Sequence, residues 1–64
     1  MQPHQKRVVD EKAELDDKMA KLKAFGLTPI FNGLPTEEKQ RLTEQEMHMG
    51  RYSDVLARRI AAFS

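Results

Sequence analysis

The chain has 64 residues, which is enough for at most one small domain. Its 11 Lys and Arg residues nearly balance its 10 Asp and Glu residues, so the net charge is only +1. A general duplex-binding protein is usually strongly basic, so this balance argues against nucleic acid as a partner. The chain contains no cysteine and only two histidines, too few for an ordinary structural zinc site. We therefore expect neither a metal nor a cofactor.

A single core in so short a chain rarely supplies more than about 3–5 kcal/mol of stability. Without a disulfide or a metal, the remaining means of stabilisation is association, so we expect a homo-oligomer. No stretch approaches the roughly 18 continuous apolar residues that a membrane span needs. Residues 1–3 are followed by charged residues and not by the apolar segment of a secretory signal. These features predict a cytoplasmic protein with no membrane partner.

The first predicted element is a helix over residues 3–25. Pro3 suits its first turn, where the missing N–H would have no partner. Apolar residues then recur every seven positions, which is helical spacing: Val8, Leu15 and Leu22. Gly26 predicts a left-handed stop at the end of this helix.

A one-turn helix is predicted next, over residues 28–33. Thr28 and Pro29 resemble an N-cap and a first helical residue, and Gly33 ends the turn. The apolar residues of this connector are expected to fold onto the end of the hairpin: Ile30, Phe31 and Leu34.

The second long helix is predicted over residues 36–62, with Thr36 as its N-cap. Apolar residues again recur every seven positions: Leu42, Met49, Leu56 and Phe63. Arg58 and Arg59 fall in the last turns, where the helix dipole favours cations. The short connector makes the two long helices antiparallel neighbours.

The predicted fold is therefore all-α, a single domain over residues 1–64. It is an antiparallel helical hairpin with a short one-turn helix in the connector, assembling into a helical-bundle oligomer. Five apolar or small residues lie outside the seven-residue rows and are expected against another protomer: Val9, Val55, Ala57, Ala61 and Ala62. Gly50, inside the second helix, costs up to about 1 kcal/mol relative to alanine. It suggests close approach by a neighbouring helix or a ligand, or else a tolerated surface glycine.

The termini of such a hairpin meet at one end, and basic residues gather there. The candidate ligand-binding residues are Arg7, Arg51, Tyr52, Arg58 and Arg59. Arginine presents a planar fork to phosphate, and a tyrosine ring offers a surface on which a base can stack. The alternative is a solvated face in which Asp54 pairs with Arg51 or Arg58 at helical spacing.

No catalytic residues are predicted. His48, Ser53 and Asp54 are the residue types of a hydrolytic triad, but Ser53 stands five positions after His48 on one helix, so the two point to different faces. No glycine-flanked nucleophile turn accompanies Ser53. The sequence therefore predicts a binding protein and not an enzyme.

The segments MQPHQKRVVDEKAELDDKMAKLKAF, FNGLPTEEKQRL and MGRYSDVLARRIAAF together cover nearly the whole chain. They resemble the small phage and prophage helical proteins of the crAss-phage 48-related family. The resemblance implies a phage protein acting in the cytoplasm of a bacterial host, and it carries over no catalytic or binding residue.

Three functions are consistent with these observations. The first is an anti-defence protein that sequesters a nucleotide immune signal, a cyclic nucleotide or an ADP-ribose-type messenger, between protomers. The second is a protein-binding inhibitor or adaptor that docks onto a host defence protein. A purely structural or regulatory phage component ranks last.

Overall fold

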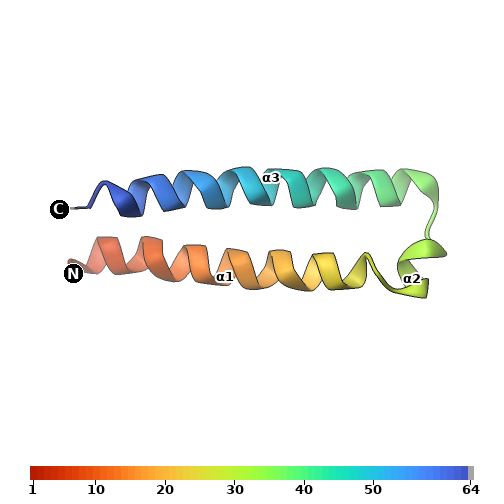
Figure 1. Cartoon of the computed structure of the whole chain (residues 1–64), viewed down its shortest axis with the longest axis horizontal. Coiled ribbons are helices and arrows are strands. Elements are labelled where there is room, and N and C mark those ends of the chain that lie inside the picture. The colour runs from red at the N-terminus through yellow and green to blue at the C-terminus, as the bar shows by residue number, and fades with distance from the viewer. Residues whose placement is uncertain (64) are drawn as a thin grey trace.

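The computed structural model describes residues 1–63 and contains two long helices and one short helix. α1 spans Pro3–Phe25, α2 spans Pro29–Asn32 and α3 spans Thr36–Ala61. Figure 1 shows α1 and α3 side by side and antiparallel, with α2 in the connector and both termini at the opposite end. The hairpin measures 47 × 15 × 13 Å. The predicted all-helical class, with two long helices and one short one, is confirmed. Neither long helix has an apolar stretch that could cross a membrane, within the described residues.

The end of α1 differs from the predicted left-handed glycine stop. Gly26 has φ −60° and ψ −16°, which is right-handed helical backbone. The helix ends instead because Thr28, which precedes Pro29, is extended at ψ 154°. The Thr28 hydroxyl and its backbone N–H both donate to the carbonyl of Phe25, at 2.7 Å and 3.0 Å. Thr28 therefore closes α1, and its hydroxyl also accepts from Phe31 N–H to open α2.

The start of α3 is one residue away from the predicted cap. Pro35 is the N-cap and Thr36 is already helical. The Pro35 carbonyl accepts the backbone N–H groups of Glu38 and Lys39, at 3.0 Å and 3.1 Å. A proline with φ near −58° can hold this extended position without a side-chain cap. At the other end, α3 stops at Ala61, so Arg58 and Arg59 do lie in its last turn.

The contact between α1 and α3 is a narrow seam. The residues that form the seam recur along each helix at alternating intervals of four and three positions, as in coiled coils. Among residues 1–63, only Val8 and Leu56 are buried apolar residues, and Leu56 is completely inaccessible. The other predicted core residues are half-buried: Leu15, Met19, Leu22, Leu42 and Met49. Two helices can cover only one side of each apolar stripe, so the core of a single hairpin is small.

The connector packs partly against this end of the seam. The rings of Phe25 and Phe31 meet edge to face, with centroids 6.0 Å apart. Phe31 and Leu34 are half-buried, as expected. Ile30 is 69% exposed, so the expectation that it folds onto the hairpin is wrong. Because α2 has only one turn, it turns Phe31 inward and leaves Ile30 facing outward.

Candidate functional site

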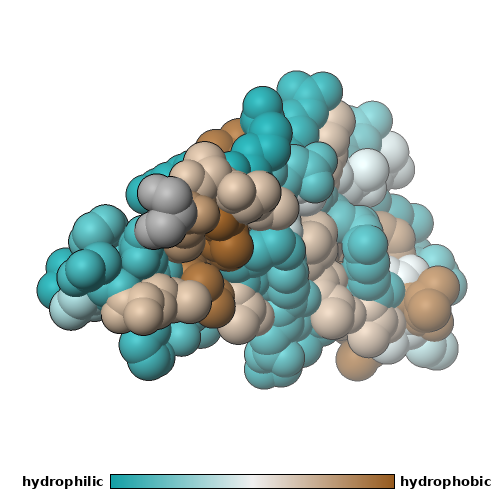
Figure 2. All heavy atoms as spheres, turned by 60° about the vertical axis from the view of Figure 1, so that its left-hand side comes forward, coloured by the Kyte–Doolittle hydropathy of each residue, from teal (hydrophilic) through white to brown (hydrophobic). Residues whose placement is uncertain are grey.

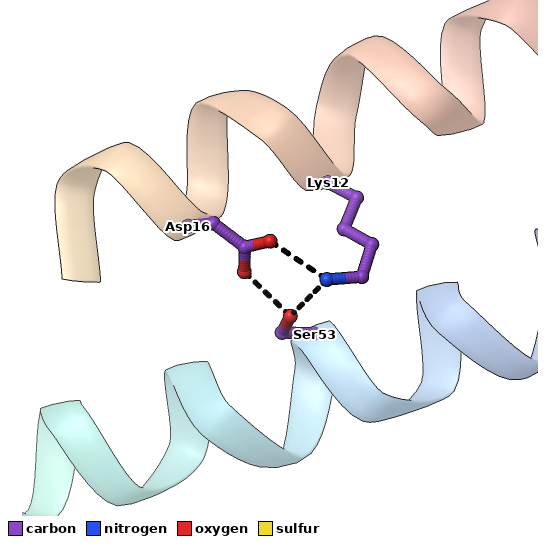
Figure 3. A network of polar contacts seen from close by, with 3 residues as sticks. All are labelled: Lys12, Asp16 and Ser53. Atoms are coloured by element: carbon purple, nitrogen blue, oxygen red, sulfur yellow. Dashed lines mark hydrogen bonds and ion pairs between the residues drawn. The ribbon is translucent and has the colours of Figure 1, made fainter. Parts of the chain in front are cut away.

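A polar network crosses the seam at its middle (Figure 3). The Ser53 hydroxyl of α3 donates to a carboxylate oxygen of Asp16 on α1, at 2.6 Å. The Lys12 ammonium donates to the Ser53 Oγ at 3.0 Å and to the other Asp16 oxygen at 2.7 Å. Ser53 is 6% exposed, so its hydroxyl would lack a partner without these two side chains. The three groups therefore satisfy one another.

The electrostatics of this network favour the charged form of the carboxyl group. Hydrogen bonds from Lys12 and then from Ser53 hold the pKa of Asp16 below its ordinary value, against a smaller opposing effect of burial. The network also fixes the alignment of the helices, since sliding α3 along α1 by one turn would separate Ser53 from both partners. Its role is therefore structural.

Sequence reasoning missed this network, although one signal was present. Ser53 occupies a seam position between Met49 and Leu56, where the row otherwise carries apolar residues. A polar residue at such a position predicts a partner on the opposite helix. The hydroxyl of Ser53 is committed to Asp16, and His48 is exposed. The triad residue types are thus not brought together, as their spacing on the helix predicted.

The five candidate ligand-binding residues all lie on the surface. The four arginines are exposed and Tyr52 is 44% exposed: Arg7, Arg51, Arg58 and Arg59. None of these arginines forms an ion pair within residues 1–63. Within residues 1–63, Asp54 pairs with neither Arg51 nor Arg58, whereas the exposure of the arginines fits the solvated face considered as the alternative.

The hairpin does not gather these five residues into one enclosed site. Arg51 and Arg58 are seven residues apart and share a row of α3, as do Tyr52 and Arg59 on the next row. Seven residues correspond to about 10.5 Å along a helix. Arg7 comes from α1, at the end of the hairpin where the termini meet (Figure 1). A single chain therefore presents an open surface, which can hold a ligand from one side only.

The surface also contains two adjoining shallow grooves near the connector, of about 260 and 350 Å³. Lys23, Thr43 and Glu46 line both grooves. We call the surface around them the groove face; its six residues are Lys23, Leu27, Thr43, Glu46, Met47 and Gly50.

Figure 2 shows the hairpin with its terminal end forward, where hydrophilic residues cover most of the surface and hydrophobic ones gather between the helices. Within residues 1–63, no three His, Asp or Glu side chains are placed to hold a metal ion.

The fold and this surface define a class of small helical hairpin that exposes arginines without ion-pair partners among residues 1–63. The Sequestin family model matches residues 2–62, nearly the whole chain. The chain belongs to the Sequestin family. Membership supports a binding protein, and the family's name is consistent with sequestration. No curated protein and no solved structure matches the chain significantly. The match does not extend to the crAss-phage 48-related family, so that resemblance stays a prediction.

Proposed function

We propose that this protein counters bacterial immunity by sequestering a nucleotide immune signal between protomers, in the cytoplasm of the bacterial host and without catalysing a reaction. The observation that carries the proposal is the set of four exposed arginines that form no ion pair within residues 1–63, with the exposed Tyr52 as a further member of the set. The signal is a cyclic nucleotide or an ADP-ribose-type messenger. The name of the Sequestin family supports the sequestering part of this function.

The chemistry of the side chains suits such a ligand. A guanidinium group binds phosphate through two parallel hydrogen bonds and stays charged at any physiological pH. An exposed tyrosine ring stacks on a nucleobase, which contributes about 1–3 kcal/mol per base. Because the arginines form no ion pairs within residues 1–63, no existing pair has to be broken when a phosphate arrives. Since one hairpin offers only an open surface, a second protomer is needed to enclose the ligand.

Calorimetric titration tests this proposal. The oligomer is titrated with cyclic dinucleotides, cyclic trinucleotides and cyclic ADP-ribose isomers, and each is compared with the Arg59→Ala variant. We expect one of these compounds to bind the native protein, and Arg59→Ala to abolish binding while leaving helical content and assembly unchanged. The matched control is Arg41→Ala, because Arg41 is also exposed but pairs with Glu38 near the connector. Native affinity in Arg59→Ala would show that the site is misplaced.

The stoichiometry of the same titration tests the position of the ligand. If two protomers enclose the ligand at one shared site, one molecule binds for every two chains. If they form two symmetric sites, both sites are lost when the protomers dissociate. Binding that persists in a monomeric variant would contradict enclosure between protomers.

A second candidate is an inhibitor or adaptor that docks onto a host defence protein. It is favoured by large apolar side chains exposed on α3: Met47 at 46%, Tyr52 at 44% and Val55 at 42%. If no nucleotide binds, capture of a defence protein by the native chain and not by Val55→Glu would support this reading.

A further inference from the structure

We propose that the groove face is the contact between two copies of this chain, with α1 of each copy packed antiparallel on α3 of the other. The copies would be related by a two-fold axis parallel to the helices, so that the two hairpins form a four-helix bundle. This inference goes beyond the proposed function, because it names the surface through which two copies associate. It does not depend on the identity of the ligand.

The exposed area of the chain supports a second copy. A compact monomeric protein of 7.4 kDa exposes about 4,200 Å². This hairpin exposes 4970 Å². The excess of about 770 Å² is close to the roughly 800 Å² that each partner buries in a standard interface. Covering one face of the hairpin would therefore give it the exposure of an ordinary compact protein.

Gly50 locates the face that is covered. A Cβ atom built on Gly50 would meet only the Sδ of Met19, at 3.9 Å, which is an ordinary van der Waals distance. The hairpin itself therefore has room for alanine, although glycine disfavours a helix interior relative to alanine. A neighbouring helix from outside the chain accounts for the glycine, because small residues allow two helix backbones to approach closely.

The charges of the groove face are self-complementary. Lys23 of α1 and Glu46 of α3 line the same two grooves, so they lie at the same height along the hairpin. Neither forms an ion pair within residues 1–63. When α1 of one copy lies on α3 of the other, each Lys23 lies at the same height as the Glu46 of the second copy. The symmetry makes this pair twice.

The same packing covers apolar groups along the length of the hairpin. Leu27 is 88% exposed and Met47 is 46% exposed, at the edges of the grooves. Val9, Ala57 and Ala61 continue the groove face toward the termini, because they stand at multiples of seven residues from Lys23, Gly50 and Met47. Three of the five residues expected against another protomer are thus placed on this face, and Val55 and Ala62 are not.

Sedimentation equilibrium without nucleotide tests the docking face. The native chain is compared with Met47→Glu on the groove face and with Val55→Glu, a matched control of nearly equal exposure on another row of α3. We expect the native chain to have twice the monomer mass and Met47→Glu to raise the dimer dissociation constant at least tenfold. Val55→Glu should behave as the native chain does. Circular dichroism checks that helical content is unchanged.

Each outcome decides the proposal. A native chain that stays monomeric at millimolar concentration overturns it, and so does dissociation by Val55→Glu without dissociation by Met47→Glu. If Met47→Glu lowers helical content, Leu27→Glu replaces it, because Leu27 is 88% exposed and lies outside the helices. A dimer that survives Leu27→Glu and Met47→Glu places the contact elsewhere. The sedimentation experiment contains no nucleotide, so its result does not depend on the outcome of the ligand titration.

Discussion

Replacing Ser53 by alanine tests whether the polar network stabilises the hairpin. The change removes a hydrogen bond to Asp16 and another from Lys12, at 2.6 and 3.0 Å. Hydrogen bonds to charged groups contribute about 1.5–3 kcal/mol each when well buried. Here the side chains of Lys12 and Asp16 are 28% and 42% exposed and keep their own ion pair, so water replaces part of what is lost. We expect Ser53→Ala to cost about 1–2 kcal/mol.

Thermal unfolding followed by circular dichroism measures this cost, at one fixed protein concentration because association would also shift the melting temperature. In a chain of this size, 1 kcal/mol corresponds to about 4–8 °C. The matched control is Thr43→Ala, whose hydroxyl donates only to the carbonyl of Lys39 in its own helix. A melting temperature for Ser53→Ala within error of both the native chain and this control would refute the reasoning.

The loss of stability caused by Ser53→Ala should also depend on pH. The pKa of Asp16 is lowered in the folded chain, so its stabilising effect is fully present above the unfolded value, about 3.9. It is lost as the pH falls through the lower folded value. The difference in stability between the native chain and Ser53→Ala should therefore be largest near neutral pH and shrink below about pH 4.

Three further changes have defined outcomes. Leu56→Ala removes a side chain that is completely inaccessible to solvent. It should cost about 2–5 kcal/mol, enough to abolish cooperative melting of so small a hairpin. Gly50→Ala, made in the Met47→Glu background, should raise the melting temperature of the single hairpin, because about 1 kcal/mol of helix propensity is gained without a clash. Asp16→Asn should lower stability at neutral pH and remove part of the acid sensitivity of the native chain, as acid titrations of the two proteins would show.

The helices could be predicted because their apolar residues repeat every seven positions. That repeat follows from the geometry of the α-helix itself, so it predicted the positions of α1 and α3 along the chain closely. The two errors at helix ends have a common cause. Gly26 and Thr36 have the residue types of a stop and a cap, but Pro29 and Pro35 already fix where the backbone turns extended. A proline's restriction on its own φ and on its neighbour outweighs the weaker preference of a glycine or a threonine.

The surface could be predicted less well than the helices. Sequence alone identified the candidate arginines, and it could not say whether Asp54 would neutralise two of them. That depends on side-chain rotamers, which spacing along a helix does not determine. The network of Lys12, Asp16 and Ser53 was missed for a different reason. Its members come from two helices, and their meeting depends on how far α3 is shifted along α1.

The pairing of charges explains how a chain of net charge +1 can present a cationic surface. Every ion pair of α1 within residues 1–63 joins a lysine to an aspartate: Lys6 with Asp10, Lys12 with Asp16 and Lys21 with Asp17. These lysines neutralise three aspartates of α1 at helical spacing, while Glu11 and Glu14 form no ion pair within residues 1–63. Four of the five arginines form no ion pair in the described part of the chain, residues 1–63: Arg7, Arg51, Arg58 and Arg59. Lysine is a mobile point charge, whereas arginine is a rigid fork that binds phosphate at two points. Most arginines thus stay outside the ion pairs within residues 1–63, as Lys18, Lys23 and Lys39 do, and arginine is the residue whose chemistry best suits a phosphate.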